Sequence, residues 1–297
     1  SWLLILPRSI IFLHIPKAAG TTLRYIIQYQ APPQGIYELY GPASGHRDRL
    51  RKLQQLSPRR LAQLQVVNAH LGFGLHEYIN RPCTYFTILR HPVSRVLSMY
   101  SYLGKTRPGF QERLSLEEFV GTCPHFAHNN MTKYLSGVKL AIQLREPGLG
   151  EADCDRRHPI TEDTLAIAKR NLVEHFTVAG LVENLPASLL LLQRLLGWEL
   201  PCLQSNVSHS QSKLATLPPS TLALIEHHNQ FDLQLYDFAQ QRFQQQLADL
   251  GPDFAREVDQ FHQANQRDRR QKLLYQLRSY YNRATHRLYK HLVRHYA

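Results

Sequence analysis

The chain has 297 residues, of which 43% are hydrophobic and 20% are charged, and its formal net charge is +12. This composition excludes a disordered chain and predicts one large folded domain. No apolar run reaches the roughly 18 residues that a membrane span needs. The four cysteines form no C-x-x-C pair, which disfavours a zinc site and a dense disulfide framework, so we expect free thiols in a reducing compartment.

Short apolar segments alternate with helical patterns along most of the chain. Residues 9–15 form the clearest strand, which runs into a turn of small residues, and residues 22–30 continue as a helix. Further strands are predicted at residues 65–69, 84–89 and 175–181, and further helices start near Pro58, Pro92, Ser115, Thr161 and Asn184. The alternation predicts an α/β, P-loop-like three-layer fold, with a central, mostly parallel sheet flanked by helices.

The C-terminal part has a different composition. Beyond Pro218 the chain is almost wholly helix-forming, with a junction between two helices at residues 229–232. From residue 251 onward, ten Lys or Arg stand against four Asp or Glu. We predict a main domain at residues 1–250 and a basic helical extension at residues 251–297. The extension carries a single apolar stripe. We expect this stripe to pack on the domain or to pair two copies as a homodimer; the alternative is that the extension contacts an acidic surface.

The turn after the first strand predicts an anion site. A helix that starts directly after a strand leaves backbone N–H groups unpaired, and its dipole adds positive potential there. Gly20 permits close approach of the backbone, Lys17 adds a charge, and Thr21 and Thr22 add hydroxyl groups. The Walker order G-x-x-x-x-G-K-[ST] is absent, which disfavours a magnesium-dependent NTPase.

A second anion site is predicted where the strand at residues 84–89 ends. Arg90 follows this strand, and the carboxyl ends of parallel strands line the ligand crevice of an open α/β sheet. Ser98, in the next helix, completes a fork that can hold a phosphate. Taken alone, Arg90 could equally pair with a local carboxylate. Two anion sites on neighbouring strand ends favour one ligand that carries phosphates at both ends.

Residues 14–22 and 89–98 resemble the 5′-phosphosulfate and 3′-phosphate motifs of the sulfotransferases that use 3′-phosphoadenosine 5′-phosphosulfate (PAPS). Over residues 9–247 the chain is most similar to the Golgi-type carbohydrate sulfotransferases, especially the heparan sulfate 6-O- and 2-O-sulfotransferases. The resemblance implies that Lys17 neutralises charge on the leaving oxygen. The implied donor-binding residues are Lys17, Ala18, Ala19, Gly20, Thr21 and Thr22 at the phosphosulfate, Arg90 and Ser98 at the 3′-phosphate, and more loosely Asn206 and Ser208 in a loop over the nucleotide.

His70 is the predicted base for the acceptor hydroxyl. It ends a strand on the ligand side, where related glycan sulfotransferases have a catalytic histidine, and a pKa of about 6.5 suits that role. The alternative is a hydrogen-bonded strand-end residue. His76 and Glu77 are the other candidates for the base, whereas His14 and His91 flank the anion motifs and are expected to be structural. Tyr102 lines the acceptor cleft in relatives, but it could equally lie in the core.

We therefore predict in-line transfer of a sulfuryl group from PAPS to a glycan or glycolipid hydroxyl, with no metal required and no nucleic-acid partner. The basic charge suits an acidic acceptor. The alternatives are a P-loop kinase of nucleosides or sugars, and an anion-binding module led by the basic tail. A cytoplasmic enzyme of bacterial type is expected, because the chain shows no N-terminal anchor; the Golgi lumen is the alternative if such an anchor was removed.

Overall fold

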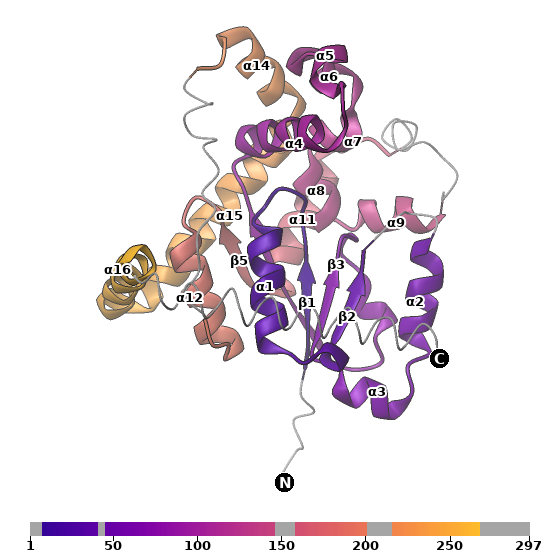
Figure 1. Ribbon diagram of the computed structural model, residues 1–297, viewed down its shortest axis with the longest axis vertical. Coiled ribbons are helices and arrows are strands. Elements are labelled where there is room, and N and C mark those ends of the chain that lie inside the picture. Colours follow the sequence, from indigo (N-terminus) through magenta and orange to yellow (C-terminus); the bar gives the residue numbers. More distant parts are fainter. Residues whose placement is uncertain (1–7, 41–44, 146–157, 201–215, 268–297) are drawn as a thin grey trace.

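A computed structural model describes residues 8–40, 45–145, 158–200 and 216–267. Among these residues, a parallel sheet is formed by β1 (Ser9–Leu13), β2 (Ile36–Leu39), β3 (Val66–Ala69), β4 (Cys83–Leu89) and β5 (Phe176–Leu181). The strand order is β2-β3-β1-β4-β5, so the chain passes from β1 to the edge strand β2, returns to β3 beside β1, and then crosses to β4 and β5 on the other side (Figure 1). A crevice at the carboxyl end of β1 is therefore the place where such a sheet binds ligands.

The strands form because their sequences are short, continuous apolar runs that suit burial on both faces. Phe12 of β1 stacks on Phe86 of β4 with 4.7 Å between ring centres, and both side chains are fully buried. The sequence predicted every strand except β2, in which Ile36 and Leu39 are buried and the two residues between them are half-buried. The predicted first strand ends earlier in the structure, so His14 and Ile15 belong to the following turn.

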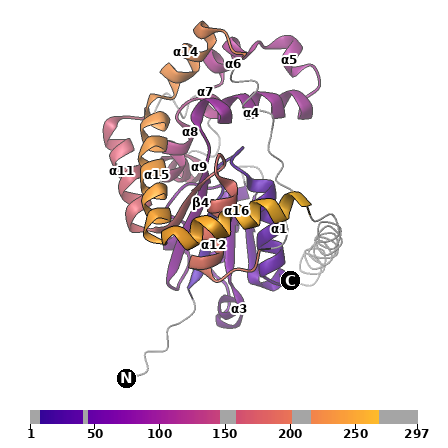
Figure 2. The ribbon, with the colours of Figure 1, turned by 90° about the vertical axis from the view of Figure 1, so that its left-hand side faces the viewer.

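Helices cover both faces of the sheet, which confirms the predicted fold class. Figure 2 shows α11 and α15 on one side of the sheet and α1 on the other. Like β5, helices α11, α12 and α15 come from the second half of the chain, and all three pack against β5. The helices nearest the sheet are α1 (Gly20–Gln30), α2 (His46–Gln54), α3 (Pro58–Gln63), α8 (Asn130–Leu135), α9 (Val138–Arg145), α11 (Glu162–Glu174), α12 (Leu185–Leu196) and α15 (Gln230–Asp249).

A group of helices gathers beyond the carboxyl ends of the strands, and we call it the cap (Figure 1). It has its own small hydrophobic core, in which Val96 and Phe119 are fully buried. Ser115 and Glu118 form the predicted capping box at the start of one of its helices. The cap consists of α4 (Pro92–Thr106), α5 (Phe110–Arg113), α6 (Leu116–Thr122), α7 (Pro124–Ala127) and α14 (Pro219–His228).

Buried polar side chains tie the junction between α14 and α15 to the start of α8. Asn229 Nδ2 donates to the Ala127 carbonyl at 2.7 Å. The carboxylate of Asp232 accepts the backbone N–H groups of Met131 and Thr132 at 2.9 and 2.8 Å. These bonds satisfy donors that the first turn of a helix leaves unpaired. The helix junction predicted at residues 229–232 is therefore confirmed, and it anchors the cap to the helices beside the sheet.

The predicted basic extension begins with α16 (Gly251–Arg267), which follows α15 after Leu250. Phe254 of α16 is 2% exposed and joins the main hydrophobic core. The start of the extension therefore packs on the domain. Residues 268–297, on which the expected apolar stripe and contact with acidic surfaces depend, lie outside the described residues.

Candidate functional site

Polar side chains follow the strands at the carboxyl edge of the sheet. Tyr40 comes directly after β2, His70 after β3, His14 after β1 and Arg90 after β4, and Glu183 lies just beyond β5. Because the strands are parallel, these ends meet at one edge, on the side where the cap lies (Figure 1). The strand order places His14 between His70 and Arg90. The two predicted anion motifs and the predicted base therefore come from neighbouring strands.

The turn between β1 and α1 has a constrained backbone. Lys17 and Ala19 have φ angles of 71° and 56°, in the left-handed region that residues other than glycine rarely adopt. Helix α1 begins at Gly20 with no side-chain cap and no acidic residue in its first turn. A left-handed residue followed by helical ones points successive N–H groups in one direction. The turn thus presents these groups, and the positive end of the helix dipole, to an anion.

Lys17 lies in positive surroundings. Burial lowers the pKa of Lys17, and the charges of Arg90 and Lys105 lower it further. The Lys17 ammonium lies over the ring of Tyr102, 4.2 Å from its centre. A cluster of cations in which one amine is already half-buried gains stability when an anion binds among them.

Arg90 joins the second anion motif to the first. Its side chain is buried, and its NH1 donates to the backbone carbonyl of Lys17 at 3.1 Å. Burial lowers the pKa of Arg90, and nearby Glu183 opposes that shift. Glu183 accepts the His91 N–H at 3.0 Å and the Tyr236 hydroxyl at 2.8 Å. The local carboxylate considered as a partner for Arg90 is therefore already hydrogen-bonded through both of its oxygens.

The remaining predicted donor residues occupy different positions. Ser98 is half-buried on α4, one helical turn before Tyr102, so the two lie on the same side of that helix. Tyr102 is 47% exposed, which places its ring at the protein surface and not in the core. In the turn, Ala18 and Gly20 are buried, Ala19 and Thr22 are half-buried and Thr21 is exposed. Asn206 and Ser208 lie outside the described residues.

His70 belongs to a chain of hydrogen-bonded side chains. Its Nε2 lies 2.6 Å from Nδ1 of His14. The same Nδ1 lies 2.9 Å from the hydroxyl of Tyr40, which donates to Oδ1 of Asn68. The backbone carbonyl of His70 accepts from Nε2 of Gln143 at 3.3 Å. His70 is therefore a hydrogen-bonded residue at the end of its strand, as the alternative expectation had it, and its role as a base stays a prediction.

Burial keeps the histidine pair neutral at pH 7. Burial, and then the charges of Arg24 and His46, lower the pKa of His70 to about 4. Burial also lowers the pKa of His14, and the charge of His70 acts in the same direction. The neutral imidazole can accept a proton from a hydroxyl group, but a pKa of about 4 makes His70 a weaker base than the pKa of about 6.5 expected from the sequence.

The other two candidates for the base lie away from this edge. His76 belongs to a short 3-10 helix (Leu75–Tyr78), and its Nδ1 lies 2.9 Å from the hydroxyl of Tyr85. Its ring also stacks on His175, which directly precedes β5. These neighbours lie toward the amino ends of β4 and β5, so His76 and the adjacent Glu77 are far from the turn that carries Lys17.

The sequence did not predict the position of Tyr40 or the contact between His14 and His70. Tyr40 follows β2, the strand that the pattern missed. Recognition of residues 36–39 as an edge strand would have placed Tyr40 at the same edge as His70. The expectation that His14 has a structural role gave no sign that its ring meets His70.

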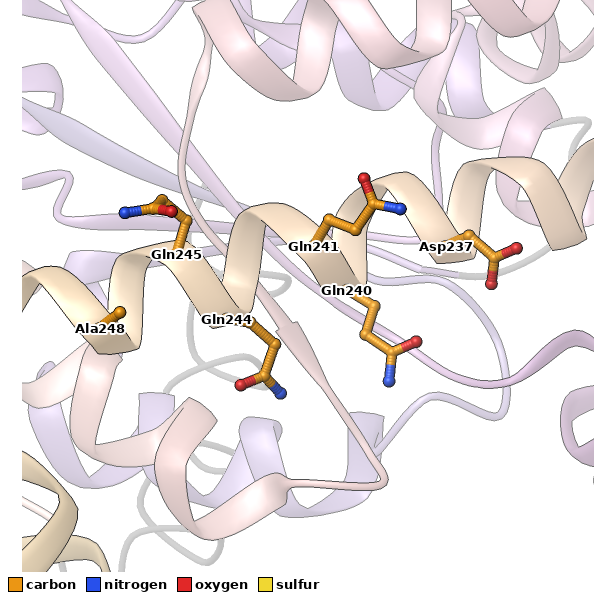
Figure 3. A pocket seen from close by; sticks show the side chains of 6 residues that line it. All are labelled: Asp237, Gln240, Gln241, Gln244, Gln245 and Ala248. Carbon is orange, nitrogen blue, oxygen red and sulfur yellow. The ribbon is translucent and has the colours of Figure 1, made fainter.

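A shallow hollow of about 590 Å³ lies elsewhere, along the polar face of α15 (Figure 3). None of the predicted site residues lines it. In the described part of the chain, no three His, Cys, Asp or Glu side chains are grouped to hold a metal ion. The hollow is lined by Asp237, Gln240, Gln241, Gln244, Gln245 and Ala248.

Comparison with known proteins identifies similar sequences. The sequence model of the family described as galactose-3-O-sulfotransferase matches residues 6–276. Galactose-3-O-sulfotransferase 3 of Homo sapiens is 28% identical over 280 residues, covering 87% of this chain and 62% of that protein. The Bos taurus protein of the same name is 27% identical over 273 residues, covering 82% and 58%. Galactose-3-O-sulfotransferase 2 of Mus musculus is 28% identical over 200 residues, covering 64% and 49%.

These matches confirm the predicted resemblance to carbohydrate sulfotransferases and correct two finer expectations. The relatives are named for galactose and not for heparan sulfate. They are mammalian proteins, so the expectation of a cytoplasmic enzyme of bacterial type is wrong. The chain spans about three fifths of the length of the first relatives. Among the helices that the structure describes, none has the length and apolar character to cross a membrane.

Proposed function

Because the chain belongs to the galactose-3-O-sulfotransferase family, we propose that it transfers a sulfuryl group from PAPS to the 3-hydroxyl of a galactose unit. The observation that carries this proposal is the 3.1 Å hydrogen bond from Arg90 to the Lys17 carbonyl. It unites two cationic motifs at the ends of neighbouring strands. A donor that carries phosphate groups at two positions fits such a pair.

The turn at residues 17–22 would hold the 5′-phosphosulfate. Its N–H groups and the α1 dipole favour an anion, and no acidic side chain in the first turn of α1 competes for them. Arg90 and Ser98 would hold the 3′-phosphate. Asn206 and Ser208 complete the proposed donor set. The mutual repulsion of Lys17, Arg90 and Lys105 supports binding of a ligand with several negative charges.

His70 would accept the proton of the attacking hydroxyl. The acceptor oxygen then forms a bond to sulfur as the bond between sulfur and the 5′-phosphate oxygen breaks, and the negative charge remains on that phosphate. Lys17 and the N–H groups of the turn stabilise this charge as it develops. Transfer of this kind depends mainly on positioning and electrostatics, which a preformed turn and a fixed base supply.

Tyr102 would line the acceptor site. Its ring is about half exposed and lies against Lys17, where the sulfuryl group would be transferred. An aromatic face packs well against the C–H groups of a sugar ring while polar hydroxyls remain solvated. This placement suits the terminal galactose of an oligosaccharide or a glycolipid.

The kinase alternative is not favoured by the family match. A nucleoside or sugar kinase needs a carboxylate for magnesium beside its phosphate turn. The first turn of α1 carries no acidic residue, and Glu183 already accepts hydrogen bonds from His91 and Tyr236.

The proposal is tested by incubating the protein with ³⁵S-labelled PAPS and a galactose-terminated disaccharide. The matched controls are the 3-deoxygalactose analogue and a heparan sulfate oligosaccharide. We expect label in the galactoside alone. Label in the 3-deoxy analogue would place the sulfate on another hydroxyl, and label in the heparan sulfate oligosaccharide alone would overturn the acceptor assignment. Stabilisation against heat by ATP with magnesium, but not by adenosine 3′,5′-bisphosphate, would overturn the donor assignment.

A further inference from the structure

The start of α4 is held by a side chain that comes from beyond another strand. His91 is the N-cap residue of α4, and its own side chain makes no capping hydrogen bond. Glu183, two residues beyond the end of β5, accepts the backbone N–H of His91 at 3.0 Å. A carboxylate at this place satisfies a donor at the start of the helix and interacts favourably with the positive end of its dipole. Because His91 directly follows Arg90, this bond also fixes the backbone from which the Arg90 side chain extends.

Tyr236 of α15 holds Glu183 in turn. Its hydroxyl donates to Oε2 of Glu183 at 2.8 Å, and its ring meets the His91 ring edge-on with 5.5 Å between ring centres. Tyr236 is 4% exposed, whereas Glu183 is exposed. Burial, and then the charge of Glu183, raise the pKa of Tyr236, so its hydroxyl remains a hydrogen-bond donor. A buried donor thus fixes the position of an exposed carboxylate.

The helix that carries Tyr236 is anchored independently of this contact. Asp232 lies four residues before Tyr236, so the two side chains lie on the same side of α15. The buried carboxylate of Asp232 accepts the N–H groups of Met131 and Thr132 at the start of α8. The side of α15 that supports Glu183 is therefore tied to the body of the protein by hydrogen bonds that need no ligand.

We propose that Glu183 and Tyr236 are positioning residues of the 3′-phosphate site, which hold the backbone at His91 so that Arg90 directs its guanidinium at the 3′-phosphate of the donor. This inference rests on the proposed function, because that function supplies the ligand with a 3′-phosphate. A guanidinium binds a phosphate best through two parallel N–H groups, so a small displacement of the side chain weakens the contact. Arg90 is 5% exposed and its NH1 donates to the Lys17 carbonyl, so it has little freedom to compensate for a shifted backbone.

The charge of Glu183 does not itself favour an anion at this place, because a carboxylate repels a phosphate. Burial lowers the pKa of Arg90 and the charge of Glu183 opposes this shift, but an arginine stays protonated without such help. The benefit of Glu183 to the site therefore comes from the hydrogen bonds that it accepts. Glu183→Gln removes the charge but keeps an oxygen for the His91 N–H and an amide that can donate to the Tyr236 oxygen. Glu183→Ala removes the charge and both contacts.

Isothermal titration calorimetry of the full chain tests this inference with two nucleotides, adenosine 3′,5′-bisphosphate and adenosine 5′-phosphosulfate, which lacks the 3′-phosphate. In Glu183→Ala, we expect the affinity for the bisphosphate to fall about tenfold and the affinity for the phosphosulfate to fall less than about twofold. Glu183→Gln should bind the bisphosphate within about threefold of the unmodified protein. Tyr236→Phe, which keeps the ring and deletes the hydroxyl, should lose about threefold in affinity for the bisphosphate alone.

Two further variants control for the site and for the route. Tyr37→Phe is matched to Tyr236→Phe, because the Tyr37 hydroxyl donates to the Arg49 carbonyl at 2.8 Å on β2, at the opposite edge of the sheet from β5. It should bind both nucleotides as the unmodified protein does. Where Arg90→Met has already removed the guanidinium, Glu183→Ala should lower the affinity for the bisphosphate by less than about twofold, because the group that it positions is absent.

Equal losses for the two nucleotides in Glu183→Ala would indicate a general structural role and overturn the inference. The same follows if Glu183→Gln binds the bisphosphate as weakly as Glu183→Ala, or if Glu183→Ala has its full effect in the Arg90→Met protein. These measurements need no acceptor. If the unmodified protein binds the bisphosphate but sulfates no galactoside, the proposed function fails while the variants still decide the inference. A protein that binds no bisphosphate would overturn both.

Discussion

The ammonium of Lys17 lies 4.2 Å from the centre of the Tyr102 ring, so the residue proposed to bind the sulfuryl donor touches the residue proposed to bind the sugar. A cation over an aromatic face is attracted by about 0.5–1 kcal/mol at an exposed position. This contact brings α4 of the cap against the turn after β1. Binding of the donor and binding of the acceptor are therefore expected to influence one another.

Two substitutions of Tyr102 distinguish the contribution of its aromatic ring from that of its hydroxyl group. Tyr102→Ala should raise the KM for a galactoside about tenfold, because it removes the aromatic face from both Lys17 and the sugar. Tyr102→Phe should change this KM less than about twofold. Steady-state kinetics with the galactose-terminated disaccharide measures both values. A Tyr102→Ala variant with an unchanged acceptor KM would show that the sugar binds elsewhere.

Gly20→Ala should disrupt the site although the substitution is small. The new Cβ would lie 1.6 Å from Nε2 of His14, so the His14 ring must move away from His70. We expect kcat to fall by about 100-fold or more. Gly121→Ala is the matched control, because a Cβ at that helical position of the cap has nothing within 4 Å. Equal activities of the two variants would contradict the described position of His14.

Arg90→Met should weaken binding of the 3′-phosphate selectively. We expect the affinity for adenosine 3′,5′-bisphosphate to fall at least tenfold, about 1.4 kcal/mol or more, and the affinity for adenosine 5′-phosphosulfate, which lacks the 3′-phosphate, to fall much less. Isothermal titration calorimetry measures both affinities. Arg51→Met, at an exposed position on α2, serves as the control. Equal losses of affinity for the two nucleotides would show that Arg90 does not bind the 3′-phosphate.

The predictable parts of the fold are those that local sequence determines. Continuous apolar runs identified β1, β3, β4 and β5, and the small-residue turn identified the start of α1. The edge strand β2 has only four residues, and its pairing with β3 depends on contacts that are distant in sequence. For the same reason Tyr40 was missed, and the contact of His14 with His70, 56 positions apart, could not be read from any local pattern.

The buried carboxylate of Asp232 should contribute strongly to stability. It accepts two backbone N–H groups at the start of α8 and the hydroxyl of Thr132 at 2.8 Å. Asp232→Ala leaves these donors buried and unpaired, so we expect the free energy of unfolding to fall by about 3 kcal/mol. Urea denaturation measures the loss. Asp237→Ala, at an exposed position on the same helix, should change stability by less than about 0.5 kcal/mol.

The histidine pair makes stability depend on pH. Burial lowers the pKa of His70 to about 4 in the folded protein, whereas an exposed histidine in the unfolded chain has a pKa of about 6.5. Between these values the unfolded chain binds more protons than the folded one, so the free energy of unfolding decreases as the pH falls through this window. The depressed pKa of His14 acts with the same sign.

Urea denaturation at about pH 7 and about pH 4.5 should therefore show a loss of stability that His70→Gln reduces. His262→Gln, at an exposed position on α16, should leave the loss unchanged. A loss of equal size in all three proteins would mean that other groups control the acid sensitivity.

The left-handed conformations of Lys17 and Ala19 affect how much conformational entropy the turn loses when it binds a ligand. A glycine at either position would adopt the same φ without strain, but it would also sample many other conformations in the absence of a ligand. Side chains at these positions restrict the turn to fewer conformations. Less conformational entropy then remains to be lost when an anion is captured, so more of the contact energy appears as affinity.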